Sequence, residues 1–391
     1  MTDDSKRFEG RKPHKPLKER RIRVGLIFGG RSGEHDVSLM SARSVMDALD
    51  REKYEVVSVG ITRTGQWLAG DALAALTAGE SGATRQAPLL PDPQAAALVD
   101  PERQSMELAS LSEVAELDVI IPILHGPYGE DGTVQGLLEL VDLPYVGAGV
   151  VGSAVGMDKA IFKSVMTANG IPILPWRLVL VSDWRSRRSA VVEELESAFC
   201  YPLFTKPANL GSSVGICRCV DRAELEAGLD TAAQYDRRIV VEQGVDAREL
   251  EVAVLGNDVP IASIVGEVRP RRDFYDYVAK YVSDDSELLI PAPLDAAVAD
   301  EVRDLALKAY KAIDCAGMGR VDLIMDRQNG SLYLNEINTI PGFTRISMYP
   351  KLWEASGIPY PKLLDRLIEL ALDRHHEKKN LKRNFRAEGT E

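Results

Sequence analysis

Acidic and amide side chains near the C-terminal end of the chain are spaced so that they would share one face of a β-hairpin. Residues 320–325 and 332–338 read as two strands around an Asn-Gly pair, which favours the positive φ values of a tight turn. Side chains alternate across a strand, so Asp322 would lie beside Glu336, with Asn338 next along. Two carboxylates this close need a proton or a cation between them, and oxygen ligands without His or Cys suit Mg²⁺.

The opposite face of this hairpin is predicted to be apolar, and its residues are Val321, Leu323, Met325, Tyr333 and Ile337. The acidic groups would then stand on an otherwise buried sheet. A solvated hairpin with scattered surface charges is the alternative interpretation, and the apolar face disfavours it.

A loop of small residues between Lys206 and Gly215 could bind phosphate. Glycine permits close approach of the backbone, and the hydroxyl groups of Ser212 and Ser213 can donate to phosphate oxygens. Lys206, at the end of a predicted strand, would add a positive charge. An ordinary hairpin loop is the alternative, and the loop alone does not decide between them. The chain has no G-x-x-x-x-G-K-[ST] motif and no G-x-G-x-x-G after its first strand, which excludes a P-loop and the usual dinucleotide site.

Other charged residues fit a nucleotide site only weakly when taken alone. Lys159 would start a helix with Asp158 as its N-cap, but a single lysine usually serves solubility. Glu242 and Glu249 are spaced so that they could reach a purine amine and ribose hydroxyls.

The elements that would position these groups are of mixed α/β type. Strands at 22–28, 56–61 and 118–124, the first followed by a glycine turn and a helix, predict a parallel sheet with ligands at its carboxyl edge. Residues 70–105 read as an insertion with little chemistry. A helix is expected from Tyr360 to about Arg374. The expected division is a disordered basic arm (1–21), an N-terminal α/β domain (22–150), a central subdomain (151–241), a C-terminal subdomain (242–374) and a charged, frayed tail (375–391).

Bulk properties exclude several classes of protein. The chain has 391 residues, of which 45% are hydrophobic and 27% charged, as in a soluble globular protein of two or three domains. A net charge of −12 argues against a general nucleic-acid binder. No apolar stretch reaches the length of a membrane span, and no secretion signal is expected. The four cysteines suggest no disulfide framework, in keeping with a reducing cytoplasm.

Taken in order, several segments resemble the D-alanine–D-alanine ligase family of ATP-grasp enzymes. The segments are Gly29–Ser38, Leu124–Thr133, Met157–Lys159, Lys206–Gly215, Phe274–Tyr281, Arg320–Asp322 and Asn335–Gly342. The resemblance covers about 22–372. It implies an N-terminal parallel-sheet domain followed by a two-domain ATP-grasp clamp. It also implies that ATP phosphorylates the carboxylate of one D-alanine, and that a second D-alanine attacks the acylphosphate to supply peptidoglycan precursors.

The resemblance assigns ligands to the nucleotide and to the metal. It implies ATP and two ions of Mg²⁺ or Mn²⁺, with metal ligands Asp322, Glu336 and Asn338. The ATP contacts it implies are Lys159, Lys206, Ser212, Ser213, Glu242, Glu249 and Lys280.

The resemblance also assigns substrate and catalytic groups. Glu34 would hold the ammonium group of the first D-alanine and hydrogen-bond with Ser212 and Tyr281 across the closed site, and His125 would lie near that substrate's carboxylate. Arg320 and the Gly342 N–H would stabilise the oxyanion. The second substrate's carboxylate would lie at Ser347 and Met348, and a loop carrying Lys280 and Tyr281 would cover the site.

Specificity and partners follow from the same resemblance. Tyr281 favours an amine acceptor, so D-alanine over D-lactate, whereas Val278 and Arg345 depart from the family's usual residues. A homodimer in the cytoplasm is implied, with no nucleic-acid or membrane partner. Three alternatives stay open: another ATP-grasp carboxylate–amine ligase, a D-lactate or D-serine ligase, and a nucleotide-binding sensor without turnover.

Overall fold

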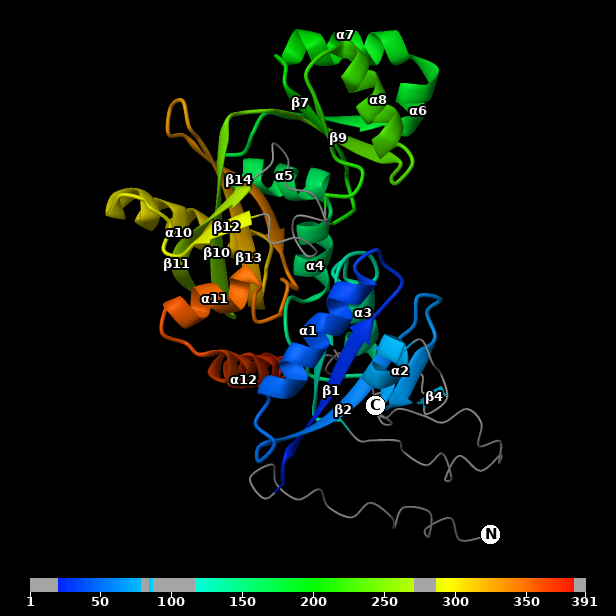
Figure 1. Cartoon of the computed structure of the whole chain (residues 1–391), viewed down its shortest axis with the longest axis vertical. Coiled ribbons are helices and arrows are strands. Elements are labelled where there is room, and N and C mark those ends of the chain that lie inside the picture. Colours follow the sequence, from blue (N-terminus) through cyan, green and yellow to red (C-terminus); the bar gives the residue numbers. More distant parts are fainter. Residues whose placement is uncertain (1–19, 79–83, 87–116, 212, 271–285, 383–391) are drawn as a thin grey trace, which may run out of the picture.

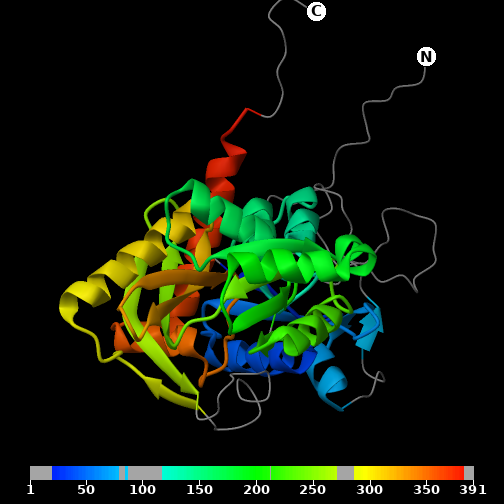
Figure 2. The same cartoon turned by 90° about the horizontal axis from the view of Figure 1, so that it is seen from above.

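The computed structural model contains three β-sheets with helices packed against them, within its described residues 20–78, 84–86, 117–211, 213–270 and 286–382 (Figure 1). The central sheet and its helices, green in Figure 1, lie at one end of the molecule, and the N-terminal sheet, blue, lies at the other. Figure 2 shows the same arrangement from above. None of the helices in these ranges is long and apolar enough to cross a membrane.

The N-terminal sheet has the strand order β4-β3-β2-β1-β5. Its strands are β1 (Ile22–Gly29), β2 (Tyr54–Ile61), β3 (Trp67–Gly70), β4 (Thr84–Gln86) and β5 (Val119–Ile123), and its helices are α1 (His35–Ala48), α2 (Ala72–Ala78) and α3 (Thr133–Leu140). β1 is parallel to both β2 and β5, which confirms the predicted parallel sheet. The edge differs from the prediction, because β3 and β4 run antiparallel and the expected insertion at 70–105 supplies α2 and β4.

The central sheet has the order β6-β9-β7-β8 and is antiparallel throughout. Its strands are β6 (Trp176–Leu180), β7 (Leu203–Pro207), β8 (Cys217–Cys219) and β9 (Arg238–Gln243). The helices beside it are α6 (Val181–Ser186), α7 (Arg188–Ala198) and α8 (Arg222–Ala232), while α4 (Val150–Met157) and α5 (Lys159–Ala168) lead into it.

The C-terminal sheet has the order β12-β11-β10-β13-β14 and is also antiparallel. Its strands are β10 (Ala247–Gly256), β11 (Ile261–Pro270), β12 (Ser286–Leu289), β13 (Gly317–Asp326) and β14 (Leu332–Asn338). The helices that follow or cover it are α10 (Ala296–Ala312), α11 (Met348–Ala355) and α12 (Tyr360–Lys379).

The predicted hairpin exists as β13 and β14, with Asp322 opposite Glu336 as expected. The first strand ends at Asp326 and the second begins at Leu332, close to the predicted bounds, but of the Asn-Gly pair only Gly330 has a positive φ, at 73°.

A register shift in this hairpin changes which side chains face the site. Leu323 pairs with Leu334, whereas its neighbour Asp322 pairs with Glu336, so Asn335 is an extra residue in β14. The strict alternation expected from the sequence fails at this point. Tyr333, predicted on the apolar face, pairs with Ile324 and is only partly buried. Leu334 is fully buried in its place.

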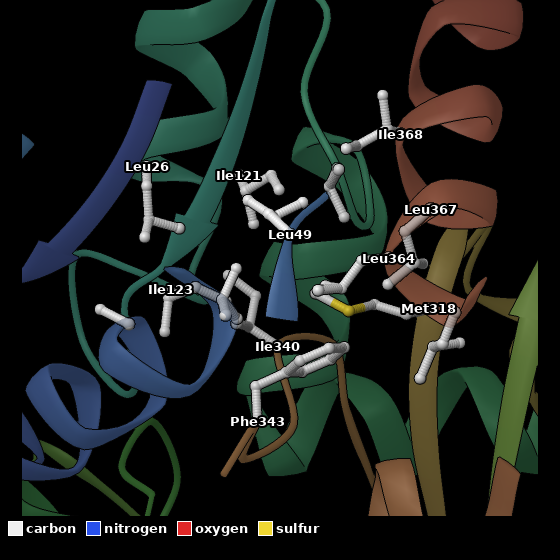
Figure 3. Close-up of a cluster of buried hydrophobic side chains, with 14 of the residues drawn as sticks. Leu26, Leu49, Ile121, Ile123, Met318, Ile340, Phe343, Leu364, Leu367 and Ile368 are labelled. Carbon is white, nitrogen blue, oxygen red and sulfur yellow. The ribbon is translucent and has the colours of Figure 1, made fainter. Parts of the chain in front are cut away.

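One hydrophobic core joins the N-terminal sheet to the C-terminal part of the chain. Figure 3 shows Ile121 and Ile123 of β5 together with Ile340, Phe343 and residues of α12, and all of those shown are buried. Each fully buried aliphatic or aromatic side chain contributes about 1.5–3 kcal/mol. The segment after β14 is therefore held against the N-terminal sheet.

The last helix is longer than predicted. α12 continues past Arg374 to Lys379, so the expectation of a frayed tail beginning at His375 is wrong over that stretch. His375 Nε2 lies 2.9 Å from the carbonyl oxygen of Asp142, and Lys378 donates to Glu139 at 2.5 Å. These contacts with the segment around α3 hold the extra turn. Residues 1–19 of the expected arm and 383–391 of the expected tail lie outside the described residues.

Candidate active site

A cavity of about 840 Å³ lies among the three sheets and collects most of the described residues that the sequence singled out. Those at its wall are Glu34, Lys159, Lys206, Ser213, Glu242, Glu249, Arg320, Asp322, Glu336 and Asn338. These residues come from segments far apart in the sequence, and the fold brings them together around one cavity.

Other candidates lie elsewhere or outside the description. His125, Gly342 and Met348 are buried, and Ser347 is partly buried ahead of α11; none of them is among the cavity's lining residues in the described ranges. Ser212, Val278, Lys280 and Tyr281 fall outside the described residues, so their assignments stay predictions.

Arg320 forms the closest contact on the acidic hairpin. Its Nε and Nη2 donate to the two carboxylate oxygens of Asp322 at 2.7 and 2.6 Å. Its Nε also lies 3.0 Å from Oε2 of Glu251, which stands opposite Asp322 on β10. Asn338 Nδ2 donates to Asp322 at 3.0 Å. Carboxylates on three neighbouring strands are thus arranged in a row, with a guanidinium as counterion.

The donor set of this hairpin fits a hard divalent cation. Asp322 and Glu336 are paired across the ladder, and Asn338 can offer its amide oxygen. Within the described residues no three His, Cys, Asp or Glu side chains form a closed cage. A site of two carboxylates and one amide suits Mg²⁺, which usually keeps water and substrate phosphate as its remaining ligands. Here Arg320 and Lys159, the latter 3.9 Å from Glu336, balance the two carboxylates.

Lys159 is placed in the cavity by the start of α5. Asp158 caps this helix by accepting from the backbone N–H groups of Ala160 and Ile161 at 3.1 and 3.0 Å, as predicted. Arg238 holds the other oxygen of the Asp158 carboxylate at 2.5 Å. The Lys159 ammonium group then donates to the carbonyl of Leu210 at 2.7 Å, which links the helix to the small-residue loop.

The small-residue loop approaches Glu34 closely. A Cβ atom at Gly211 would lie 3.0 Å from Oε2 of Glu34, and one at Gly126 would lie 2.6 Å from the same oxygen. Only glycine leaves room for the carboxylate at these two positions. Ser213 and Gly215 have positive φ values of 58° and 74°. The N–H and C=O groups of the loop therefore point in directions that differ from those in a regular strand.

Glu242 is 1% exposed and lies between two lysines. Lys206 donates to its Oε2 at 2.8 Å, and Lys163 Nζ lies 3.2 Å from its Oε1. Burial by itself would raise the pKa of Glu242, but the charges of Lys163 and Lys206 outweigh it and lower the pKa to about 2. The carboxylate is therefore ionised at any physiological pH.

A buried network from the N-terminal domain holds the backbone at 340–343. His125 Nδ1 lies 2.9 Å from the Ile340 carbonyl oxygen, and its Nε2 lies 3.3 Å from Ser41 Oγ. Ser41 Oγ accepts from the N–H of Phe343 at 3.3 Å. Burial lowers the pKa of His125, against the opposing charge of Glu34. A neutral imidazole that donates through Nδ1 and accepts through Nε2 satisfies every one of these contacts.

Glu130 completes this network. Its two carboxylate oxygens accept from the N–H of Gly126 at 2.7 Å and from the N–H of Ile340 at 3.1 Å. Burial and then the charge of Glu34 raise the pKa of Glu130 to about 8. One carboxyl group thus bridges the loop after β5 and the loop after β14.

Sequence reasoning missed several residues that the structure places in or beside the cavity. They are Glu130, Lys163, Glu251 and Asn335. Lys163 follows Lys159 by one helical turn and Glu251 follows Glu249 by two strand positions, so periodicity could have indicated them. Asn335 could be identified only from the register shift in β14, and Glu130 only from its tertiary contact with Ile340. Local spacing in the sequence indicates neither.

The chain is similar in sequence to a known protein family. Residues 23–148 match the family model described as D-ala D-ala ligase N-terminus, and residues 165–369 match the one described as D-ala D-ala ligase C-terminus. A D-alanine–D-alanine ligase of Heliobacterium modesticaldum is 49% identical over 356 residues, which is 91% of this chain and 96% of the relative.

Solved structures of ligases have the same fold as this chain. The D-alanine–D-alanine ligase from Coxiella burnetii has a TM-score of 0.79 and 36% identity, covering 92% of this chain and 96% of that chain. The VanG D-Ala:D-Ser ligase from Enterococcus faecalis also has a TM-score of 0.79, with 32% identity, covering 90% of this chain and 100% of that chain.

Proposed function

Because the chain belongs to the D-alanine–D-alanine ligase family, whose fold is ATP-grasp, we propose that it joins two D-alanine molecules at the expense of ATP and so supplies D-alanyl-D-alanine for peptidoglycan synthesis. One observation carries the proposal beyond family membership. A single cavity collects the acidic hairpin, the lysines Lys159 and Lys206, and the Glu34 carboxylate. These are the groups needed to handle phosphate, a cation and an amino-acid ammonium group together.

The reaction proceeds in two steps. The γ-phosphoryl group of ATP is transferred to a carboxylate oxygen of the first D-alanine, giving an acylphosphate and ADP. The amine of the second D-alanine, after loss of its ammonium proton, attacks the acyl carbon. Inorganic phosphate leaves with the C–O electron pair and takes up the remaining amine proton, so that a neutral amide bond is left.

Metal ions support the phosphoryl transfer in this proposal. Asp322, Glu336 and Asn338 would hold Mg²⁺ or Mn²⁺, with two ions as the expected number, and the cations would neutralise charge on the phosphates. Lys159, 3.9 Å from Glu336, and Lys206 add positive charge at the cavity wall, and Ser213 lies in the small-residue loop that also lines the cavity.

The nucleotide is held by acidic residues deeper in the cavity. Glu242, ionised and fixed by its lysine partners, can accept from the exocyclic amine of adenine. Glu249 lies at the wall on β10 and is assigned to the ribose hydroxyls. This geometry supports an adenine nucleotide, because guanine presents an acceptor where adenine presents a donor.

Substrate carboxyl and ammonium groups are assigned to the opposite end. Glu34 binds the ammonium group of the first D-alanine, near His125. Arg320 stabilises negative charge on the acylphosphate and on the tetrahedral intermediate, with the N–H of Gly342 as a second donor. The second D-alanine's carboxylate lies at Ser347 and Met348, where the N-terminus of α11 favours an anion.

The covering loop remains part of the proposal although it lies outside the described residues. By the family resemblance, Lys280 would contact the ATP phosphates, and Tyr281 and Ser212 would hydrogen-bond with Glu34. Closure excludes water, which would otherwise hydrolyse the acylphosphate. Tyr281 supports an amine acceptor over D-lactate.

Organisation and location are further parts of the proposal. We assign the domains 22–150, 151–241 and 242–374, supported by the separate sheets of the three segments, and a homodimer that works in the cytoplasm. Light scattering of the purified chain tests the dimer. A monomer at micromolar concentration would refute it.

A product assay tests the function. The purified chain is incubated with ATP, Mg²⁺ and D-alanine, with D-serine or D-lactate as competing acceptors, and products are identified by mass spectrometry. We expect D-alanyl-D-alanine with one phosphate released per dipeptide, and no phosphate release without D-alanine. A preference for D-serine would assign the chain the acceptor named for the VanG relative. Nucleotide binding without any phosphate release would favour the sensor alternative.

A further inference from the structure

Lys163 is a buried cation behind the wall of the cavity. It lies in α5, one helical turn after Lys159, and is 1% exposed. Its Nζ is 3.2 Å from Oε1 of Glu242, while Lys206 donates to Oε2 of the same carboxylate at 2.8 Å. Lys206 lines the cavity, but Lys163 is not among the lining residues in the described ranges. Each oxygen of one buried carboxylate thus has its own ammonium group.

The two lysines have different tasks. A carboxylate as buried as Glu242 stays ionised only with a nearby cation. Lys206 also faces the ligand, so a bound nucleotide competes with Glu242 for its ammonium group. Lys163 is absent from the cavity wall in the described ranges, and its ion-pair partner is Glu242, whose Oε1 lies 3.2 Å from its Nζ; the charges of Lys206 and Glu336 also act on it. Burial lowers the pKa of Lys163, and the charge of Glu242 opposes that shift.

We propose that Lys163 is a positioning residue of the nucleotide site, which acts through Glu242 and keeps its carboxylate ionised and correctly oriented while Lys206 engages the nucleotide. The inference rests on the proposed function and deepens it, because it explains how a buried acid can bind the ligand when one of its two counterions is shared. Lys163 itself need not touch the nucleotide.

The test measures ATP affinity in Lys163→Met, which keeps the length of the side chain and removes its charge. Binding of a non-hydrolysable ATP analogue with Mg²⁺ is measured by calorimetry, and kcat and KM are measured in the dipeptide assay. We expect the Kd and the KM for ATP to rise about tenfold, less than for truncation of a buried charge that contacts the ligand directly, and to rise by more than kcat falls. The matched control is Lys311→Met, an exposed lysine on α10, which should leave Kd and KM unchanged.

A double-mutant cycle separates positioning from general destabilisation. In a Glu242→Gln background, adding Lys163→Met should change the analogue's Kd by less than about twofold, because the carboxylate through which Lys163 acts is absent. The inference would be overturned if Lys163→Met bound the analogue with the Kd of the wild type. It would also be overturned if adding Lys163→Met to Glu242→Gln still raised the Kd tenfold. If circular dichroism shows that Lys163→Met does not fold, Lys163→Gln takes its place in both backgrounds. Failure of the wild-type chain to make dipeptide would instead refute the proposed function.

Discussion

At the residue scale, the cavity is governed by how its charges are paired. Asp322 shares the guanidinium of Arg320 with Glu251, Glu336 lies near Lys159, and Glu242 lies between two lysines. Each of these four acids thus has a base beside it before any ligand enters. A cation and an anionic nucleotide that enter together can exchange these partners without leaving a buried charge uncompensated.

Glu336→Gln tests the metal assignment. Loss of one anionic oxygen leaves the cation under-neutralised, so turnover should fall by about 100-fold or more, as when a main electrostatic contributor is removed. The fold should persist, because Glu336 is partly exposed, and circular dichroism checks this. Glu301→Gln, an exposed residue of α10, is the matched control. Full Mg²⁺-dependent turnover in Glu336→Gln would contradict the assignment.

Glu130 predicts a pH dependence of stability. Its folded pKa, raised to about 8, lies above the ordinary value of 4.5, so the folded state favours the protonated form. The contribution is therefore fully present below pH 4.5 and is lost as pH rises from 4.5 to 8. Over that window the free energy of unfolding of the wild type, relative to Glu130→Gln, should fall by up to about 1.4 kcal/mol per pH unit. Denaturant titrations of both proteins at several pH values measure it, and a flat difference would refute it.

At the element scale, loops and helix starts place the charged groups. The small-residue loop touches Glu34 at Gly211, α5 presents Lys159 from its first position, and the register shift in β14 turns Asn335 toward the cavity, where Lys206 lies 3.5 Å away. Each is a local backbone feature with a consequence for ligand geometry.

Gly211→Ala should impair substrate binding with little loss of stability. The new Cβ atom would lie 3.0 Å from Glu34 Oε2, the end of a flexible side chain, so the carboxylate moves and the backbone does not. We expect kcat/KM for D-alanine to fall about threefold to tenfold, because the carboxylate must move by a few tenths of an ångström, which is less than the 1 Å misplacement that costs about 100-fold. Gly136→Ala, where a Cβ atom meets nothing within 4 Å, is the control. Wild-type kinetics for Gly211→Ala would show that Glu34 is not held at this loop.

Asp158→Ala removes the N-cap of α5. The free energy of unfolding should fall by about 1–2 kcal/mol, and the KM for ATP should rise, because Lys159 loses its fixed helix start. Asp221→Ala removes the cap of α8, which accepts from Glu224 N–H at 2.9 Å and is not part of the cavity wall. It should cost similar stability with no change in KM. Equal KM values for both variants would contradict the role given to α5.

At the scale of the whole molecule, the active-site backbone is fixed by contact between distant parts of the chain. The segment 340–343 follows the last strand of the C-terminal sheet, yet it packs against β5 and α12 in one core (Figure 3) and hydrogen-bonds with Glu130, His125 and Ser41. The N-terminal domain therefore supports the backbone that carries the donor proposed at Gly342.

Phe343→Leu tests this coupling. The ring of Phe343 lies 5.5 Å from that of Tyr349 and 5.8 Å from that of Tyr360, so the substitution should cost about 1–2 kcal/mol of unfolding free energy. It should also lower kcat, because the neighbouring Gly342 N–H moves. Phe162→Leu, in a separate buried cluster, should cost similar stability with a smaller effect on kcat. If the two variants lose equal activity, the core around 340–343 has no special role in catalysis.

Much of the local structure followed from the sequence. The parallel β1 and β2, the Asp158 cap and the pairing of Asp322 with Glu336 were all predicted, because periodicity, capping residues and strand alternation act over a few residues. The resemblance to a ligase family, and with it the fold class, also came from residues in linear order.

Only the tertiary structure decided how distant segments meet. The extra residue at Asn335, the pairing of Lys163 with Glu242 and the bridge from Glu130 to Ile340 depend on contacts across large sequence separations. Whether a buried acid is neutral or ionised depends on these contacts too. Burial and neighbouring charge set a pKa, and neither is a property of a residue's place in the chain.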